Sequence, residues 1–442
     1  MSKESTESYM ISAQNHQQQL SGNNNLKNIY RGTLAALCLG AVLAVSSCSP
    51  KTTGGVLKNP NVYGNKDREP GKNPSESDKK EDAKKDDKVK GSEQANSIAL
   101  LLPFQLNMIA NQNVVEADVK RSALALDFYQ GFQLGVNEVA KKPGDFNLKV
   151  MDTQDNEMKN LSIAASKEVE SASLIVGPVY PKEIRSFAKG NKNTKVLQVN
   201  PLAATMPTEF NIANLVSLTP PIRIHMRAIA GEMMKKYMDN DVIIVFDARD
   251  TDHRNFIAGF DEEIKKLNPT AKIVHVTSVA QLKQTIPDLG TALVISGTTE
   301  KTQLRSLVTA LDDKVGEGYA IRLFGHPLWS RVDFRPYDNF YRMDPTISSE
   351  SHLKVWSSDV QNFQKNYKNN FKVDPSDFAY KGYDAGKYFA TLLSKYGTEY
   401  AEKVVDEKFS GIFSDYQFNY NPTWGYVNQA VKIRTYRNGS FQ

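Results

Sequence analysis

The sequence contains almost no cysteine. Its two cysteines, Cys38 and Cys48, both lie near the N-terminus, so the rest of the chain carries no thiol. This distribution excludes a disulfide scaffold, a cysteine-based zinc site, an iron–sulfur cluster and a cysteine nucleophile.

The chain also lacks a strong excess of charge of either sign. The chain has 55 basic and 50 acidic side chains, which gives a formal net charge of +5. Nucleic-acid-binding proteins usually concentrate Lys and Arg on one face, and here no basic block stands clear of neighbouring acids. We therefore expect no nucleic-acid partner.

The motifs of common enzymes and cofactors are absent as well. The chain has no P-loop, no strand-linked G-x-G-x-x-G, and no G-x-S-x-G or S-x-x-K in a convincing setting. His225, His253, His275 and His352 lack the spacing of metal ligands. These absences predict a protein that is not an enzyme and that binds neither a cofactor nor a metal.

The N-terminal region contains one hydrophobic run, and it is short. Residues 32–47 are uncharged and follow Lys27 and Arg31, whereas a spanning helix needs about 20 apolar residues. A basic segment, a short apolar run and small residues are typical of a secretory signal, which begins at Met1 or at Met10. We expect residues 1–47 to be an N-terminal extension and signal.

The end of this run resembles a bacterial lipobox, in which an aliphatic and two small residues precede a cysteine that is acylated. Here the residues are Val45-Ser46-Ser47-Cys48. The resemblance implies lipidation of Cys48, and Ser49 in place of Asp implies the outer membrane. Residues 50–53 lack the early acidic cluster of surface-exported lipoproteins, so we expect the protein to face the periplasm. The alternative interpretation is that Cys48 is an incidental thiol.

Residues 48–96 are predicted to be the lipidated cysteine followed by a flexible tether. The run 79–88 mixes Lys with Asp and Glu and has almost nothing apolar to bury. As a flexible coil, this tether would span about 35–40 Å. The folded part would then work away from the membrane.

From residue 97 onward, the sequence alternates between predicted strands and helices. The first series has strands at 98–102, 148–151, 174–176 and 196–199 with helices at 123–140, 163–169 and 184–188. The second has strands at 242–246, 273–276, 292–296 and 321–324 with helices at 255–267, 279–286 and 301–311. Helices at 355–367 and 378–396 and strands at 417–421 and 426–436 follow.

Strict alternation of strands and helices predicts parallel sheets with right-handed crossovers. Two series predict an α/β protein with two doubly wound lobes joined by a hinge. We expect an N-lobe of about 97–213 plus 350–410, and a C-lobe of about 214–349 plus the C-terminal strands. Ligands of open α/β sheets bind at the carboxyl ends of the strands, so this arrangement predicts a hinged binder.

Five short motifs occur in order along the folded part of the chain. They are Leu101-Leu102-Pro103, Phe128-Tyr129-Gln130-Gly131, Ile175-Val176-Gly177-Pro178, Asn200-Pro201-Leu202-Ala203 and Gly382-Tyr383-Asp384-Ala385. Together they resemble the type I periplasmic binding proteins, the leucine/isoleucine/valine-binding superfamily. The resemblance covers about residues 97–436 and is nearest to the bacterial branch labelled amino-acid ABC-transporter binding or LysM-linked proteins. This resemblance implies the type I fold.

Candidate ligand-binding residues follow the predicted strands. In the N-lobe they are Phe104, Gln105, Tyr180, Lys182, Ala203 and Thr205, and in the C-lobe they are Asp247, Arg249, His326 and Trp329. Asp247 and Arg249, with Asp250, either bind a polar ligand or cap the helix that begins near residue 251.

The resemblance also indicates which ligand to expect. Amino-acid binders of the superfamily hold the ligand carboxylate with Thr205 and with a Ser or Thr in the loop 179–182, where this chain has Pro181 and Lys182. They hold the α-amino group with an acid near residue 325, where this chain has His326. These departures disfavour a simple α-amino acid.

Two functions remain open at this point. The first is a membrane-anchored periplasmic lipoprotein that closes on a small polar ligand or cell-wall fragment and works with an ABC permease. The second is a regulatory or scaffold lipoprotein that acts on an envelope enzyme, for which the C-terminal domain of the activator of a peptidoglycan synthase offers a precedent of this fold.

Overall fold

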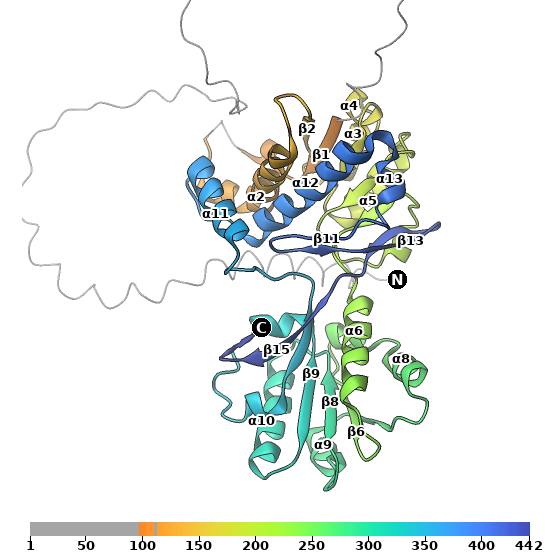
Figure 1. The fold of residues 1–442 in the computed structure, drawn as a ribbon, viewed down its shortest axis with the longest axis vertical. Helices are drawn as coiled ribbons and strands as arrows, with labels where there is room; N and C mark the ends of the chain where they lie inside the picture. The colour runs from red at the N-terminus through yellow and green to blue at the C-terminus, as the bar shows by residue number, and fades with distance from the viewer. Residues whose placement is uncertain (1–96, 110–112) are drawn as a thin grey trace, which may run out of the picture. The chain divides into compact units, whose positions relative to one another are not determined.

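The computed structural model of the 442-residue chain describes residues 97–109 and 113–442. The expected signal, the lipidated Cys48 and the tether at 48–96 lie outside the described residues. Two sheets of seven strands each, with helices on both faces, make up the described part (Figure 1).

The first sheet forms the N-lobe and has the strand order β13-β14-β5-β4-β3-β1-β2. Neighbouring strands run parallel except for the pair β13 and β14. Its strands are β1 (Ser97–Leu102), β2 (Asn147–Asp152), β3 (Leu174–Val176), β4 (Gln198–Asn200), β5 (Leu215–Ser217), β13 (Phe418–Asn421) and β14 (Gly425–Asn428).

Helices cover both faces of this sheet because its strand residues alternate between two cores. On one face, Ile98 and Leu100 pack with Phe128 and Phe389, from α2 (Glu116–Val139) and α12 (Asp377–Tyr396). On the other face, Leu101 belongs to a core formed with α3 (Glu157–Ala164), α4 (Lys167–Glu170) and α5 (Pro181–Gly190). The strand β2 is the edge of the sheet.

The second sheet forms the C-lobe and has the order β16-β15-β10-β9-β8-β6-β7. Strands β6 to β10 pair in parallel, whereas β15 and β16 are antiparallel. The strands are β6 (Val242–Phe246), β7 (Ile273–Val276), β8 (Ala292–Ser296), β9 (Ile321–Gly325), β10 (Thr346–Ser349), β15 (Lys432–Arg437) and β16 (Ser440–Phe441).

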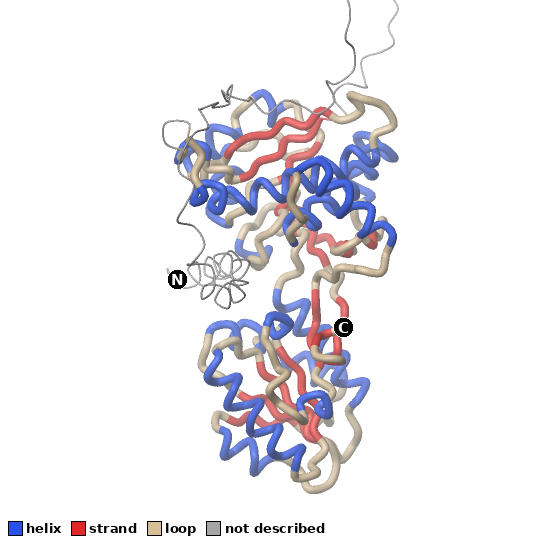
Figure 2. The backbone as a smooth tube through the Cα atoms, turned by 90° about the vertical axis from the view of Figure 1, so that its left-hand side faces the viewer, coloured by secondary structure: helices blue, strands red, loops and turns tan. Residues whose placement is uncertain are grey.

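The C-lobe sheet is also covered on both faces. One core unites the strands with α6 (Ile222–Lys236), α7 (Thr251–Ile257) and α8 (Phe260–Leu267). The other unites them with α9 (Val279–Thr285) and α10 (Lys301–Gly316). Figure 2 shows the strands of each sheet between layers of helices.

The chain passes between the two sheets three times: from β5 to α6, from β10 to α11 (Ser358–Phe371), and from β14 to β15. Near the second crossing, a two-stranded sheet pairs β11 (Phe409–Ser410) with β12 (Asp415–Tyr416) and follows the short helix α13 (Tyr400–Lys403). Short connecting segments of this kind can serve as a hinge between two lobes.

The structure confirms the predicted two-lobe α/β fold and corrects several boundaries. The expected helix at 255–267 is two helices, because Gly259 adopts a left-handed φ of 77° between α7 and α8. The expected strand at 426–436 is divided between β14 in the first sheet and β15 in the second.

The content of the lobes also differs from the expected division. The strand β5 completes the first sheet, so the first crossing comes after Ser217 rather than near residue 214. The C-terminal strands β13 and β14 belong to the N-lobe, whereas β15 and β16 belong to the C-lobe. The C-terminal strands thereby pair with β5 in the first sheet and with β10 in the second, which would otherwise be open edges.

Candidate functional site

Three loops meet at the carboxyl edge of the N-lobe sheet. They are residues 103–105 after β1, residues 152–155 at the end of β2, and residues 177–182 after β3. Because β1 lies between β2 and β3 in a parallel arrangement, the three loops emerge side by side. We call these loops the strand-end platform.

The carboxylate of Asp152 ties two loops of the platform together. Its Oδ1 accepts hydrogen bonds from the backbone N–H of Gln105 at 3.0 Å and of Gln154 at 2.9 Å. Its Oδ2 accepts from the backbone N–H of Leu106 at 2.8 Å. Charge-assisted bonds of this kind are stronger than neutral ones, so Asp152 fixes the shape of both loops.

The loops that Asp152 holds contain backbone strain. Gln105, Gln154 and Asp155 adopt left-handed φ angles of 56°, 58° and 49°. A non-glycine residue in this region costs about 1–2 kcal/mol, and such residues cluster at ligand sites. Three of the left-handed non-glycine residues of the described chain therefore lie in the platform, and the others are Asn211, Asp344, Lys372 and Asn438.

The third loop of the platform leads into α5 and is shaped by Gly177. Its φ of 105° and a distance of only 2.1 Å between an added Cβ and the carbonyl oxygen of Leu101 require glycine. At the start of the helix, Glu183 Oε2 accepts from the backbone N–H of Tyr180 at 3.2 Å. Glu183 Oε1 accepts from Asn160 Nδ2 at 2.9 Å.

Two acids of the platform, Glu183 and Asp155, have raised pKa values. Glu183 is 1% exposed, and burial raises the pKa of its carboxyl. Partial burial also raises the pKa of Asp155, and the charge of Lys182 acts against it. Burial, with the nearby carboxylates of Asp155 and Glu183, raises the pKa of the Tyr180 phenol to about 12.

Ala203 lies after β4, but its backbone groups already have partners. Asn200 Nδ2 donates to the carbonyl oxygen of Ala203 at 2.8 Å, and Asn200 Oδ1 accepts from the N–H of Ala203 at 3.0 Å. Thr205, the next candidate, is buried.

Phe104, in the loop after β1, is half-buried and lies edge-on to Tyr129, with 6.1 Å between the ring centroids.

In the C-lobe, Asp247 follows β6 and bonds to two histidines. Its Oδ2 is 2.7 Å from His275 Nδ1, and its Oδ1 is 3.3 Å from His253 Nε2. His253 Nδ1 accepts from the backbone N–H of Gly297 at 3.1 Å, so Nε2 carries the proton and donates to Asp247.

The neighbours of Asp247 divide between a cap and an exposed side chain. Asp250 caps α7 by accepting from the backbone N–H of His253 at 2.9 Å. Arg249 is exposed, and its backbone N–H donates to Gln303 Oε1 at 3.1 Å. The guanidinium of Arg249 is therefore more accessible to a ligand than the carboxylate of Asp250.

Two predicted C-lobe residues are corrected by the structure, which buries them. Trp329 is 1% exposed, and its Nε1 donates to the carbonyl oxygen of Thr298 at 2.7 Å. His326 is 6% exposed, its Nδ1 accepts from the N–H of Leu328, and burial lowers its pKa to about 3. Both side chains serve the C-lobe core rather than a surface open to ligand.

The sequence interpretation did not include Asp152, Asp155 and Glu183. A signal for Asp152 was present, because an acid directly follows a predicted strand. A signal for Glu183 was its spacing of three residues from Tyr180, as in a capping box. The role of Asp155 depends on a left-handed turn that has no clear sequence signal.

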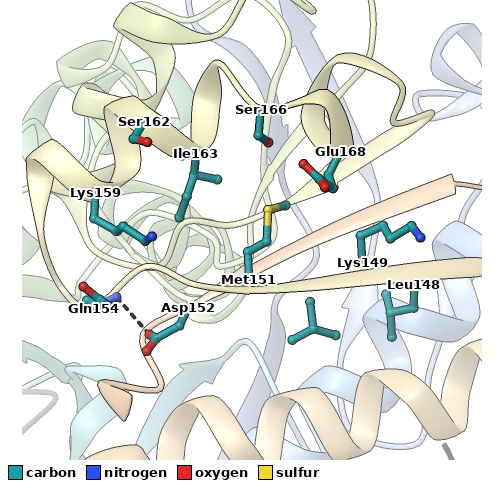
Figure 3. A pocket seen from close by; sticks show the side chains of 11 residues that line it. Leu148, Lys149, Met151, Asp152, Gln154, Lys159, Ser162, Ile163, Ser166 and Glu168 are labelled. Carbon is teal, nitrogen blue, oxygen red and sulfur yellow. Dashed lines mark hydrogen bonds between the residues drawn. The ribbon is translucent and has the colours of Figure 1, made fainter. Parts of the chain in front are cut away.

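A groove of about 550 Å³ runs along β2 beside the platform (Figure 3). One wall is β2, and the other is formed by α3 and the start of α4. Its lining includes Met151, Asp152, Gln154, Lys159, Ser162 and Glu168. Asp152 and Gln154 thus belong to both the groove and the platform.

A much smaller cavity, of about 10 Å³, lies where the crossing segments meet the N-lobe. It is about the size of one water molecule. Its lining includes Thr219, Glu350, Lys381, Ser414 and Asn428.

Within 97–109 and 113–442, no helix is both long and apolar enough to cross a membrane. Across the same ranges, no three or more His, Cys, Asp or Glu side chains form a group that could hold a metal ion.

The two parallel-dominated sheets and their crossings have the type I periplasmic-binding-protein fold. Among solved structures, the chain is similar to one described as a branched-chain amino acid ABC transporter from Rhodospirillum rubrum. The match has 14% identity and a TM-score of 0.54, and it covers 78% of this chain and 99% of that chain.

Two further structures have the same fold. The ABC transporter substrate-binding protein from Desulfitobacterium hafniense matches at 14% identity, over 78% of this chain and 98% of its own, with a TM-score of 0.50. The C-domain of LpoA from Haemophilus influenzae, a regulator of PBP1A, matches at 15% identity over the same shares, with a TM-score of 0.50. No family model and no curated protein matches the chain.

Proposed function

We propose that the chain is a binding protein, not an enzyme, that closes its two lobes on a small polar or envelope-derived ligand. The observation that carries this proposal is the strained platform, where Asp152 holds Gln105 and Gln154 in left-handed conformations. Backbone strain of this kind persists only where the surroundings enforce it, and it is typical of ligand sites.

The fold supports the same proposal. Three crossings between the lobes are suited to hinge closure around a ligand. Two of the structures with this fold are described as ABC transporter proteins, so an ABC permease is the partner that we propose for the transport role. The proposed contacts are the platform in the N-lobe and Asp247 with Arg249 in the C-lobe.

The test is a thermal-shift screen of the purified full chain with amino acids, peptides, amino sugars and muropeptides. A ligand at 100 times its dissociation constant adds about 2.7 kcal/mol to the free energy of unfolding. We expect a hit whose affinity falls at least tenfold in Asp152→Asn. A screen without any hit contradicts the proposal.

Asp145→Asn is the matched control for that variant. Asp145 Oδ2 also accepts two backbone N–H groups, from Lys141 at 2.8 Å and Lys142 at 3.0 Å. These bonds lie before β2, at the opposite end from the platform. Equal loss of affinity in both variants would show that the effect is not specific to the platform.

A second candidate function is regulation of an envelope enzyme without a small ligand. The observation in its favour is that the backbone N–H groups of Tyr180 and Ala203 already have partners in Glu183 and Asn200. LpoA, a regulator of PBP1A, has a domain with this fold. Crosslinking in cells distinguishes the two, because transport predicts recovery of permease subunits and regulation predicts recovery of a cell-wall enzyme.

For either function we propose anchoring by acylated Cys48 in the outer membrane, facing the periplasm. The support is the lipobox-like run that ends at Cys48. We expect the chain to sediment with membranes and Cys48→Ser to release it or to remain unprocessed. Unchanged membrane association of Cys48→Ser would contradict acylation.

A further inference from the structure

We infer that the groove along β2 binds an extended peptide segment of a partner protein, which adds a strand to the edge of the N-lobe sheet. This inference goes beyond the proposed function, because the occupant is a protein segment that lies along the edge of the sheet. It holds whether or not the platform binds a small ligand.

The first argument is the set of backbone groups that β2 leaves without partners. The N–H of Thr153 donates to the carbonyl oxygen of Leu102 in β1 at 3.0 Å. Successive residues of a strand direct their backbone groups to opposite sides, so Leu148, Val150 and Asp152 direct theirs away from β1. Because β2 is the last strand of its sheet, these outward groups have no strand partner among the described residues.

The second argument is the shape of the groove. It follows residues 148–152 of β2, and α3 with the start of α4 flanks it on the other side (Figure 3). The strand β2 has 6 residues and is therefore about 20 Å long. A groove of this form suits a single extended segment that lies between the strand edge and the helix, with its main chain paired to the outward groups of β2.

The third argument is the apolar centre of the groove. Met151 packs against the core that α3 covers, and Ile163 of α3 belongs to the same core. Both residues line the groove. Since side chains alternate along a strand, every second side chain of a bound segment faces this centre. The segment that fits therefore carries an apolar residue at one of these positions.

Charged side chains lie at both ends of the groove. Lys159 lies at the end near Asp152 and Gln154, whereas Lys149 and Glu168 lie toward the other end (Figure 3). Among the described residues, none of Lys149, Lys159 and Glu168 forms an ion pair within 4.0 Å. All three charges are therefore available to a bound segment.

Charge complementarity differs between the two ends. Three backbone N–H groups already bond to the carboxylate of Asp152, so Lys159 has no free acid beside it. At the other end, the charges of Lys149 and Glu168 cancel. The segment that fits carries an acidic residue beside Lys159, two positions from its apolar residue, because this spacing puts both side chains on one face.

The experiment measures the binding of defined peptides to the purified full chain by calorimetry. The probe is the N-acetylated heptapeptide amide Thr-Glu-Thr-Val-Thr-Glu-Thr. It reads the same in both directions, so it presents a Glu to Lys159 in either orientation. We expect this probe to bind at least tenfold more tightly than its analogue with Lys in place of both Glu residues.

Two methylated forms of the probe test strand addition. One carries N-methyl groups on its Glu and Val residues, and the other carries them on its Thr residues. Alternate residues of a strand direct their N–H groups toward the neighbouring strand, so one form should lose binding and the other should keep it. Amide hydrogen exchange gives a second readout, because the bound probe should slow exchange at Leu148, Val150 and Asp152.

Variants of the chain test the assignment to β2 and α3. Val150→Pro removes an outward N–H without removing a bond to β1, and it should weaken probe binding at least tenfold. Val150→Thr keeps the N–H and should leave binding unchanged. Lys159→Glu should reverse the preference between the Glu and Lys peptides, whereas Lys189→Glu, at an exposed position of α5 outside the groove, should not. Urea unfolding of each variant checks that the fold is retained.

Several outcomes would overturn the inference. Failure of the Glu probe, equal affinity of the Glu and Lys peptides, or the same response to both methylated forms would each reject it. Slow exchange at the outward amides of the free monomer would show that a segment of this chain fills the groove. Slow exchange that appears only at high protein concentration would assign the groove to a second copy. In each case the proposed binding function is decided separately by its own ligand screen.

Discussion

Gly131 in α2 lies against the backbone of Ala379 in α12 so closely that an added Cβ would be 1.9 Å from the carbonyl oxygen of Ala379. The same relationship recurs one turn further along each helix. Gly135 in α2 and Gly382 and Gly386 in α12 leave only 2.2–2.3 Å to a facing carbonyl oxygen. The two helices therefore approach with their backbones in contact, which explains the spacing of both pairs of glycines.

The first prediction concerns this contact. Gly131→Ala should lower the free energy of unfolding by about 3 kcal/mol, because a backbone oxygen cannot move aside as a flexible side chain can. Urea unfolding of the full chain, followed by circular dichroism, measures the change.

Gly231→Ala is the control. Gly231 lies in α6, and nothing lies within 4 Å of an added Cβ. Alanine favours a helix over glycine by about 1 kcal/mol, so this variant should be as stable as the parent or more stable. Equal destabilisation by both substitutions would contradict the close-contact explanation.

A second prediction concerns Asp384, the acidic residue of the motif Gly382-Tyr383-Asp384-Ala385 in α12. Its carboxylate is buried and accepts the backbone N–H groups of Ile412, Phe413 and Ser414 at 2.7–2.9 Å. Burial raises its pKa to about 7, and these three bonds act in the opposite direction.

Asp384→Asn turns one acceptor into an NH₂ group that faces a backbone donor. We expect a loss of about 1–3 kcal/mol in the free energy of unfolding at pH 8, the cost of an unpaired buried donor. The half-buried loop carboxylate of Asp145 is the comparison, since Asp145→Asn should cost less. An equal or smaller loss for Asp384→Asn would contradict this role.

The third prediction concerns the ion pair at the second crossing. Glu350 Oε1 and Lys381 Nζ are 2.6 Å apart, with side chains 25% and 20% exposed. Burial alone would raise the pKa of Glu350, but several opposing effects, of which the charge of Lys381 is the largest, together hold the pKa below its usual value. The pair joins the segment after β10 to α12.

A double-mutant cycle of Glu350→Gln and Lys381→Met measures this connection. We expect a coupling of about 1 kcal/mol, reduced from the value of a fully buried pair by partial exposure. The exposed pair Lys368 and Asp374, at 2.9 Å, should give a coupling near zero. Similar coupling energies in both pairs would show that the ion pair between Glu350 and Lys381 does not stabilise the crossing segment.

The fourth prediction is a dependence of stability on pH. His225 is buried, its Nδ1 lies 3.0 Å from Ser348 Oγ, and burial lowers its pKa from 6.5 to about 4. The unfolded chain therefore binds a proton that the folded chain excludes between pH 6.5 and 4. The free energy of unfolding should fall by about 3 kcal/mol across this window from His225 alone.

His225→Gln should remove this part of the acid sensitivity, measured as the difference in free energy of unfolding between pH 7 and pH 4.5. His275 offers a contrast of opposite sign. Burial alone would lower its pKa, but bonds to Asp247 and Asp261 raise it. Its stabilising effect is present below pH 6.5 and is lost as the pH rises through the raised pKa, so His275→Gln should weaken stability more at pH 5 than at pH 8.

The sequence predicts the architecture well because buried parallel strands are continuous apolar runs with turn residues at their ends. The strands at 174–176, 242–246, 273–276 and 292–296 are found at the predicted residues. The strand β10 (Thr346–Ser349) was not predicted, because the polar residues of Thr346-Ile347-Ser348-Ser349 do not form an apolar run.

The candidate site was harder to predict. Position after a strand is a valid signal for Phe104 and Gln105, but it does not tell whether a side chain turns inward, as that of Trp329 does to cover Gly325. The charge of Asp155 acts on the phenol of Tyr180, which lies in a loop that follows a different strand. Such effects depend on tertiary structure and leave no local pattern.

The arrangement of the last strands makes both lobes depend on the same C-terminal segment. The strand β14 pairs with β5 in one sheet, and β15 pairs with β10 in the other, so neither sheet is complete without these last strands. Without them, Leu215–Ser217 and Thr346–Ser349 become open edges, which are templates for aggregation. A truncation before β13 therefore leaves both lobes incomplete at once.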